Sequence, residues 1–320
     1  MKTVLVHPSS FHADDVFAVA TLMLAIREDW YVVRSQDPKD IAEADVVFDV
    51  GGEYDVTRRR FDHHQTGGAG VRENGIPYAS FGLAWKTYGS TAVAAHGAEL
   101  APEALVEVAK AVDARFVAAL DANDCGVDLV SSAHPSEVIP STLSSLVASY
   151  NLTWRELEEA GDNADSIRRD RFLQLVEMAK GALDRVIRRE IDRRLGEDDV
   201  REALEHAPDR RVIVLNAERP WFDVLESAEE ALYCVYPDSR GGWAAKAVRA
   251  KKGSMESKLP FPESWRGKRD AELVTASGVA DARFCHNSGF LASANTKEGA
   301  LALVAASLAA AGRPNLILTV

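Results

Sequence analysis

The chain has little cysteine, no long apolar run and no excess of positive charge. Its three cysteines, Cys125, Cys234 and Cys285, stand singly without Cys-x-x-Cys spacing, which argues against a disulfide framework or a cysteine zinc site. No stretch approaches ~18 uninterrupted apolar residues, so no membrane span is predicted. The first ten residues, MKTVLVHPSS, hold too short an apolar run for a signal peptide. We therefore expect a soluble cytoplasmic protein that contacts no membrane.

The net charge is −12, from 37 Lys and Arg against 49 Asp and Glu. This balance argues against a protein that coats duplex DNA, because such binding depends on neutralising phosphates. Between Arg240 and Asp270, however, nine Lys or Arg oppose three acids. Such a segment is often a solvated loop. It could also clamp the phosphates of a short strand, with Trp243 or Trp265 stacking on a base.

With 320 residues, the chain fits one large or two ordinary domains. Valine-rich, strand-like runs alternate with helix-like segments over the first part of the sequence, which favours a mostly parallel sheet covered on both faces. We expect strands at 3–7, 30–35 and 44–50, and helices at 14–28, 80–88 and 102–120.

The second part of the chain opens with a charged segment, 163–206, that carries an apolar stripe typical of a long amphipathic helix. Beyond it we expect strands at 211–215, 231–235, 244–248 and 316–320, and a helix at 297–310. The predicted fold is α/β, with a doubly wound, mostly parallel domain joined by a long helix to a smaller α+β domain. The predicted boundaries are 1–160, 161–206 for the helical connector, and 207–320.

Histidines and aspartates fall where the predicted strands and helices end. His7 ends the first strand and Asp49 the third, and ligands of open α/β sheets bind at the carboxyl ends of strands. Taken singly, such a histidine is more often structural and such an aspartate a helix cap. Their joint placement favours a metal site, because gathered carboxylates repel one another unless cations are present. Two divalent cations can share such a cage, and imidazole with carboxylate suits Mn²⁺, Fe²⁺, Co²⁺ or Zn²⁺.

Seven ordered sequence blocks resemble a known family. Asp62-His63-His64 resembles the signature of the DHH phosphoesterase superfamily. The wider blocks resemble the melanocyte-proliferating-gene family within it, and they run through nearly the whole chain. The blocks are HPSSFHADDVFA at 7–18, DVGGEYD at 49–55, RRFDHHQ at 59–65, DANDCG at 121–126, VYPD at 235–238, LPFPESWRG at 259–267 and FCHNSGF at 284–290.

The resemblance implies a DHH-type fold of two domains with a cleft between them and a site for two divalent cations, Mn²⁺ before Mg²⁺. It implies a metal-dependent phosphoesterase, a 3′→5′ exonuclease whose partner is RNA or a short oligonucleotide. Carried over by residue, one cation has the ligands His7, His12 and Asp49. The other has Asp14, Asp49, His63 and Asp121, with Asp124 as the alternative to Asp121.

The resemblance also implies roles outside the ligand set. Asp15 and Asp62 would orient the ligands. From its place next to a ligand, we further expect His64 to donate a proton or a hydrogen bond to the phosphoryl group. On the substrate side, His286 resembles the family's substrate-contacting histidine, although a histidine bonded to backbone is an equal alternative. The remaining expected substrate contacts are Asn287, Gly289, Arg249 and Lys258.

The sequence departs from the family pattern at three places. Pro8-Ser9 replaces the usual Asn-Gly, Asp15 replaces a glutamate, and Asn287-Ser288 stands where small residues are usual. The last departure leaves the substrate open. A small-molecule phosphoesterase or pyrophosphatase of the superfamily, and a metal-bound RNA-binding or regulatory protein without turnover, are the alternatives. The native metal and a homodimer are also left open.

Overall fold

The computed structural model describes residues 1–97, 100–129, 140–314 and 316–317. The chain divides into two compact units, Met1–Ile191 and Asp192–Val320. Among the described residues, no helix combines the length and the apolar character needed to cross a bilayer.

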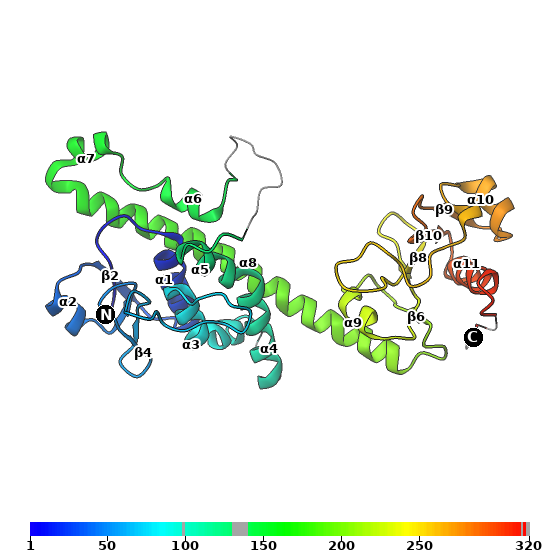
Figure 1. Ribbon diagram of the computed structural model, residues 1–320, viewed down its shortest axis with the longest axis horizontal. Coiled ribbons are helices and arrows are strands. Elements are labelled where there is room, and N and C mark those ends of the chain that lie inside the picture. Colours follow the sequence, from blue (N-terminus) through cyan, green and yellow to red (C-terminus); the bar gives the residue numbers. More distant parts are fainter. Residues whose placement is uncertain (98–99, 130–139, 315, 318–320) are drawn as a thin grey trace. The chain divides into compact units, whose positions relative to one another are not determined.

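The first unit is built on a five-stranded sheet with the order β2-β1-β3-β5-β4 (Figure 1). Strand β1 runs parallel to β2 and β3, and β3 runs parallel to β5, whereas β4 is antiparallel to β5. The α/β prediction is confirmed, with one antiparallel strand at the edge. The strands are β1 (Lys2–Val6), β2 (Trp30–Arg34), β3 (Val46–Phe48), β4 (Tyr54–Asp55) and β5 (Arg60–Phe61).

Helices cover both faces of this sheet. Successive residues of a strand point to opposite faces, and apolar residues on both faces need to be covered. Val4 and Val6 face the core that holds α1 and α3, whereas Leu5 faces a smaller cluster that includes Ile41 of α2. The first ten residues of α1 are all buried, and α1 packs along α3. The helices of this unit before α8 are α1 (Ala13–Ala25), α2 (Pro38–Glu43), α3 (Ser80–Ala94), α4 (Pro102–Val112), α5 (Ala118–Asp124), α6 (Leu143–Ala148) and α7 (Trp154–Ala160).

The helix predicted at 102–120 is interrupted and longer than expected. A π-helical turn at Asp113–Val117 separates α4 from α5, and α5 continues to Asp124. The segment therefore places both Asp121 and Asp124 inside a helical turn that packs against α1 and α3.

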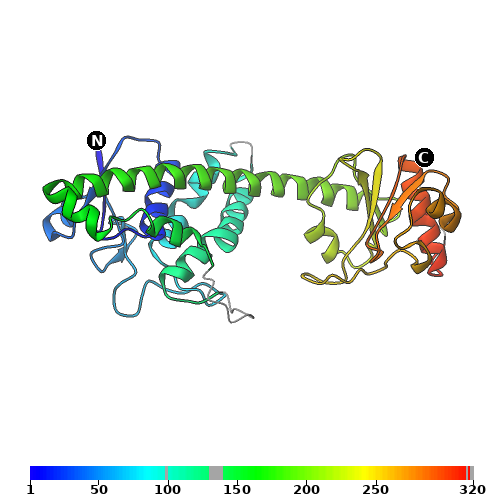
Figure 2. The same cartoon turned by 90° about the horizontal axis from the view of Figure 1, so that it is seen from above.

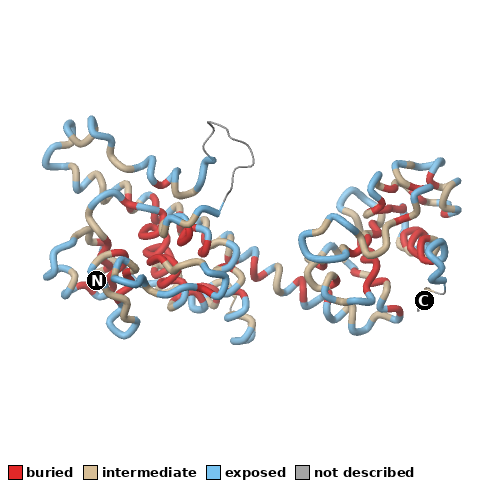
Figure 3. The backbone as a smooth tube through the Cα atoms, viewed as in Figure 1, coloured by how far each residue is buried: buried red, intermediate tan, exposed pale blue. Residues whose placement is uncertain are grey.

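Helix α8 (Ala164–Glu205) has 42 residues and confirms the long helix predicted at 163–206. Its residues divide between the two units, since the boundary falls after Ile191. Phe172 and Leu183 are buried in the core of the first unit, and Val200 is buried in the second. Figure 3 colours the backbone by burial and shows buried residues inside each unit. The segment predicted as a connector thus contributes to both cores.

The second unit has a mixed five-stranded sheet in the order β6-β7-β8-β10-β9, in which only β6 and β7 run parallel. Helix α11 packs on β7, β8 and β10 (Figure 2). The strands are β6 (Val212–Val214), β7 (Tyr233–Pro237), β8 (Trp243–Ala247), β9 (Ala282–Cys285) and β10 (Leu291–Ala294). The helices are α9 (Phe222–Ser227), α10 (Asp270–Ser277) and α11 (Lys297–Ala310).

Sequence patterns located three of these strands and α11, but they missed β9 and β10. The strand expected at 316–320 falls largely outside the described residues, and Leu316 and Ile317 lie in no strand.

Candidate metal centre

Two of the expected ligands follow neighbouring parallel strands. His7 comes directly after β1 and Asp49 directly after β3, so both reach the same edge of the sheet. The Nε2 atom of His7 lies 3.5 Å from Oδ2 of Asp49. Asp49 has a φ of 59°, which is uncommon for a residue with a side chain. This left-handed conformation follows the end of β3, where the Asp49 carboxylate lies beside His7 and His63.

The Asp-His-His segment follows β5 and adds a second group of side chains at this edge. The Nε2 atom of His63 lies 3.2 Å from Oδ1 of Asp49 and 3.2 Å from Oδ2 of Asp124. Asp124 comes from the last turn of α5, and the buried Asp14 comes from the first turn of α1. Segments far apart in the chain therefore converge on one point.

Three groups of ligand atoms lie close enough together to hold a cation. In each group the atoms are within 4.8 Å of one another: His7, His12 and Asp49; Asp49, His63 and His64; and Asp14, His63 and Asp124. Asp49 and His63 each belong to two groups. The arrangement thus suits adjacent cations with a shared carboxylate.

The polar atoms of the site are poorly satisfied by the protein alone. The Nε2 atoms of His7 and His63 and the Oδ2 atom of Asp15 are buried and make no well-directed hydrogen bond. Such atoms are rare in folded proteins and call for an explanation such as a bound ion. Imidazole nitrogens and carboxylate oxygens are also the ligands that first-row transition metals accept. The residues present therefore fit a divalent cation.

The electrostatics of the site point the same way. Burial raises the pKa of Asp14 well above its ordinary value, and the charges of Asp49, Asp124 and Asp121 raise it further. Burial on its own lowers the pKa of His63, but its contacts with the carboxylates of Asp124 and Asp49 outweigh burial and raise the pKa to about 11. The carboxylates thus create a strongly negative environment that retains protons when no cation is bound.

Backbone amides at the start of α3 hold Asp14 in place. Its oxygens accept hydrogen bonds from the N–H groups of Ser80 at 3.0 Å and Phe81 at 2.7 Å. The Ser80 hydroxyl donates to Oδ1 of Asp49 at 3.1 Å. The N-terminus of α3 therefore orients two of the candidate ligands, and its dipole favours their negative charge.

Asp15 and Asp62, the two residues expected to orient the ligands, each contact a candidate histidine. Asp15 accepts the backbone N–H of His12 at 3.0 Å, and its other oxygen lies 3.0 Å from His7 Nε2. Asp62 is buried and lies 2.7 Å from Nδ1 of His64, while its second oxygen accepts the N–H of Gly52 at 2.6 Å. Each carboxylate thus fixes the loop that carries a candidate ligand.

Asp121 and Asp124 have different surroundings, although the sequence could not separate them. Asp124 lies beside His63, as described above. Asp121 is fully buried and accepts hydrogen bonds from Arg72 at 2.7 Å and from the N–H of Gly82 at 3.0 Å. It belongs to none of the three ligand groups found among the described residues. In this geometry Asp124, rather than Asp121, lies with Asp14 and His63 in one of those groups.

Sequence patterns missed Arg72, Ser80 and Gly82. Arg72 binds both oxygens of Asp113 at 2.9 and 2.8 Å, in addition to Asp121. It lies in a loop without periodicity, so nothing in the sequence marked it. Ser80 could have been recognised from its place at the start of a predicted helix.

The expected substrate-side residues lie in the second unit and form two groups. His286, Asn287 and Gly289 share the turn between β9 and β10, where the ring of His286 lies 2.9 Å from the Ser288 hydroxyl. Gly289 has a φ of 70°, a conformation that favours glycine.

The second group, Arg249 and Lys258, contacts residues of α9 and the residue that follows it. Lys258 donates to the backbone oxygens of Leu225 and Ala228 at 3.2 and 2.6 Å. The Arg249 guanidinium lies 2.7 Å from Glu226. Both side chains thus already have interaction partners within the second unit.

A hollow of about 420 Å³ adjoins the metal centre. It is lined by His12, Asp14 and Asp124 on one side and by Thr142, Ser144 and Ser145 on another.

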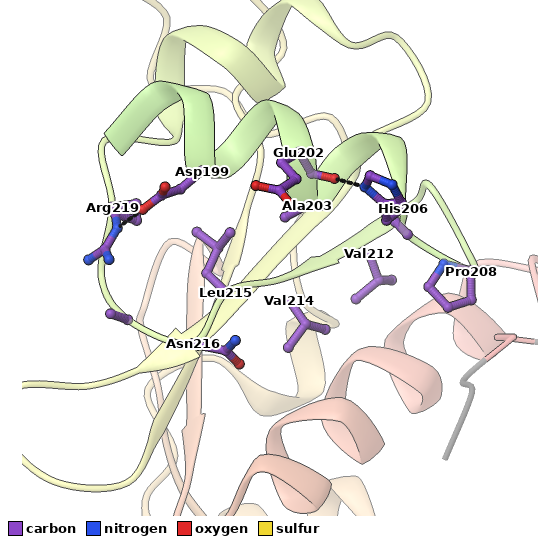
Figure 4. A pocket seen from close by; sticks show the side chains of 12 residues that line it. Asp199, Glu202, Ala203, His206, Pro208, Val212, Val214, Leu215, Asn216 and Arg219 are labelled. Carbon is purple, nitrogen blue, oxygen red and sulfur yellow. Dashed lines mark hydrogen bonds and ion pairs between the residues drawn. The ribbon is translucent and has the colours of Figure 1, made fainter. Parts of the chain in front are cut away.

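A larger hollow of about 500 Å³ lies in the second unit, between the end of α8 and β6 (Figure 4). There Asp199 pairs with Arg219 at 2.5 Å, and the ring of His206 bonds the backbone of Glu202. The smaller hollow is the one beside the candidate ligands.

Comparisons with known proteins give the family of the chain. Residues 3–308 match the family model MYG1_exonuc, described as uncharacterised protein family UPF0160. The chain is 31% identical to the MYG1 exonuclease of Homo sapiens over 95% of its own length and 85% of the relative. It is 31% identical to the MYG1 exonuclease of Bos taurus, over 95% of the chain and 84% of the relative. It is also 31% identical to the MYG1 protein of Dictyostelium discoideum, over 96% of both chains.

No solved structure matches the chain at a significant level. The matching relatives and the family model nevertheless span almost the whole sequence, including every residue of the candidate metal centre. The chain therefore belongs to the MYG1 exonuclease family.

Proposed function

We propose that the protein is a divalent-metal-dependent phosphodiester hydrolase that acts as a 3′→5′ exonuclease on RNA or short oligonucleotides. The observation that carries the proposal is Asp49, whose carboxylate is shared by two groups of candidate metal ligands. Two-metal sites with a shared ligand are common in phosphoryl transfer. Relatives that match 95% of this chain are named exonucleases, which supports the same chemistry.

We propose two cation positions with Asp49 between them. His7, His12 and Asp49 would hold one cation, and Asp14, Asp49, His63 and Asp124 would hold the other. When bound, the cations would act as Lewis acids and lower the pKa of water towards neutrality. Mn²⁺ is our first choice because the ligands mix imidazole and carboxylate. The DHH-type fold of the first unit is part of the same proposal, supported by its mostly parallel sheet.

His64 is proposed to act on the phosphoryl group. Asp62 lies 2.7 Å from its Nδ1 atom, which fixes the ring and leaves Nε2 for another partner. The side chain is 61% exposed, so a substrate can reach it. A histidine held by a buried carboxylate can donate a hydrogen bond or a proton to an oxygen of the scissile phosphate.

The hollow beside the metal centre is proposed to take the terminal nucleotide. Its wall includes Asn123 and Ser144, whose amide and hydroxyl groups can bond ribose hydroxyls. In the second unit, the half-buried His286 and the exposed Asn287 are proposed to contact substrate phosphates. Lys258 is better explained as a side chain that closes the end of α9, because its amino group donates to two backbone oxygens there.

A hydrolysis panel tests the proposal. The protein is incubated with Mn²⁺ and with short RNA, short DNA, cyclic dinucleotides or pyrophosphate, and an Asp49→Ala variant serves as the control. We expect 5′-labelled RNA to shorten from its 3′ end, and the variant to lose this activity. Turnover of pyrophosphate alone would replace the exonuclease with a small-molecule phosphoesterase. RNA binding without any cleavage would instead indicate a regulatory protein.

The cellular location is also a proposal. The three cysteines are free, as expected in a reducing compartment, and we propose the cytoplasm.

A further inference from the structure

A second pocket of the first unit, of about 330 Å³, lies where the edge strand β2 meets the beginning of α8. It shares no lining residue with the candidate metal ligands, although Pro8 of its wall directly follows His7. The wall also includes Asp165 and three arginines, Arg34, Arg168 and Arg169. Three arginines thus face one carboxylate in the wall, and a second carboxylate, the buried Asp15 outside the wall, also attracts Arg34, which leaves an excess of one positive charge.

Arg34 has two buried side-chain nitrogens that lack a partner, more than the other two arginines among the described residues. Its guanidinium lies over two aromatic rings that pack edge to face, 5.0 Å from the centre of Phe11 and 5.2 Å from that of Phe172. Nη2 donates to the backbone oxygen of Ser9 at 2.7 Å. Nε and Nη1 are buried and have no hydrogen-bond partner. A buried charged donor without an acceptor is costly, so an acceptor is missing at this position.

The neighbouring arginines strengthen this conclusion. Arg169 stacks over the ring of Tyr31 at 4.3 Å, and its Nε atom is also buried without a partner. Arg168 pairs with Asp165 at 2.8 Å. Burial lowers the pKa of Arg34 and the charge of Arg168 lowers it further, against the attraction of the carboxylates of Asp15 and Asp165. Two arginines with unsatisfied donors and a third beside them form an arrangement that an anion would stabilise.

We propose that this pocket is a binding site for a phosphate group, separate from the metal centre. Guanidinium groups bind phosphate through paired hydrogen bonds, and Arg34, Arg168 and Arg169 supply several donors on one wall. The volume is at the low end of the range for small-ligand sites, which fits a single phosphate with its sugar rather than a large cofactor. The phosphate comes either from a free anion or from the backbone of a nucleic acid.

Calorimetric titration of the full chain in the presence of a chelator tests the site, because without metal the other centre has no cation to hold phosphate. The titrants are inorganic phosphate and a tetranucleotide of RNA. We expect both to bind. Arg169→Gln and Arg168→Gln each weaken that binding by about tenfold or more, the loss expected when one charge-assisted hydrogen bond is removed.

Arg189→Gln is the matched control, since Arg189 is an exposed arginine of α8 that does not line the pocket. Its affinities should equal those of the wild type. Tighter binding of the tetranucleotide than of phosphate, with the same loss in the two variants, identifies the backbone of a nucleic acid as the source. Equal affinities identify a free anion.

The proposal is overturned if neither titrant binds, or if Arg168→Gln and Arg169→Gln bind as well as Arg189→Gln. Substitution of Arg34 is avoided because its ring contacts make it part of the core. Hydrolysis by the metal-loaded wild type is measured separately, so failure of the phosphate site is distinguishable from failure of the proposed exonuclease.

Discussion

Nη2 of Arg72 donates a hydrogen bond of 2.7 Å to Oδ2 of Asp121, and both side chains are buried. The bond explains how several carboxylates can crowd together at one end of the sheet. Arg72 also binds both oxygens of Asp113, so one guanidinium compensates two acids. Asp121 also accepts the N–H of Gly82 and so holds the start of α3, whereas the proposed cation ligands are other carboxylates.

Replacing Arg72 with leucine should destabilise the first unit strongly. The substitution leaves Asp121 buried without its partner, and removing one side of a buried ion pair costs about 3–5 kcal/mol. Urea unfolding followed by circular dichroism measures the loss. Arg59→Leu, at an exposed arginine of the same unit, is the control and should change the free energy of unfolding far less. A similar, small change in both variants would contradict the role given to Arg72.

Asparagine substitutions should distinguish Asp124 from Asp121. Asp124→Asn removes a carboxylate 3.2 Å from His63, and we expect Mn²⁺ affinity to fall at least about 10–100-fold with little loss of stability. Asp121→Asn weakens the pair with Arg72, so it should lower stability more than metal affinity. Mn²⁺ titration by electron paramagnetic resonance, together with thermal melting, checks both effects. The reverse pattern would make Asp121 the ligand.

Much of the site could be predicted from the sequence because its residues follow regular elements. His7 and Asp49 end strands with clear valine-rich patterns, and Asp14 begins an apolar helix, so their convergence follows from parallel-sheet geometry. The choice between Asp121 and Asp124 could not be predicted. It depends on Arg72, whose position is set by a loop that has no periodic pattern.

The second unit was less predictable for a similar reason. Strands β9 and β10 are four residues long, which is too short for a clear alternation of apolar and polar residues. The turn His286–Gly289 between them has no pattern that predicts a hairpin. Lys258 looked like a free cation in a positive segment. Its contacts with two backbone oxygens depend on the fold of α9, and a count of charges in the sequence does not predict that fold.

The metal-free protein should lose stability as the pH rises above about 6.5. His63 has a pKa near 6.5 when unfolded and about 11 when folded, so its stabilising contribution is complete below 6.5 and is lost towards 11. The raised pKa of Asp14 acts in the same direction, because the folded state again binds more protons. We expect the Tm in chelator to fall by at least ~2–4 °C between pH 6.5 and 9, the shift that corresponds to about 1 kcal/mol.

Mn²⁺ should reverse this slope, because bound metal replaces the protons and binds more tightly as the ligands lose them. Melting curves at several pH values, with chelator or with Mn²⁺, measure both slopes. His63→Gln should flatten the metal-free profile. His206→Gln, at an exposed histidine of the second unit, should not. A metal-free Tm that is independent of pH would count against the protonated state of His63.

Two glycine-to-alanine substitutions in helices should have opposite effects. Gly82 lies in the first turn of α3, and a methyl group there would collide with Oδ2 of Asp121 and lie 2.5 Å from Nη2 of Arg72. Because both groups are held in a buried pair, neither can move aside, and we expect the free energy of unfolding to fall by about 1–3 kcal/mol.

Gly181 lies in α8 with no atom within 4 Å of the added methyl group, so alanine should stabilise the protein by about 0.5–1 kcal/mol through helix propensity. Urea unfolding of the two variants measures both changes, and a stabilising Gly82→Ala would show that the Arg72–Asp121 pair can yield space beside α3.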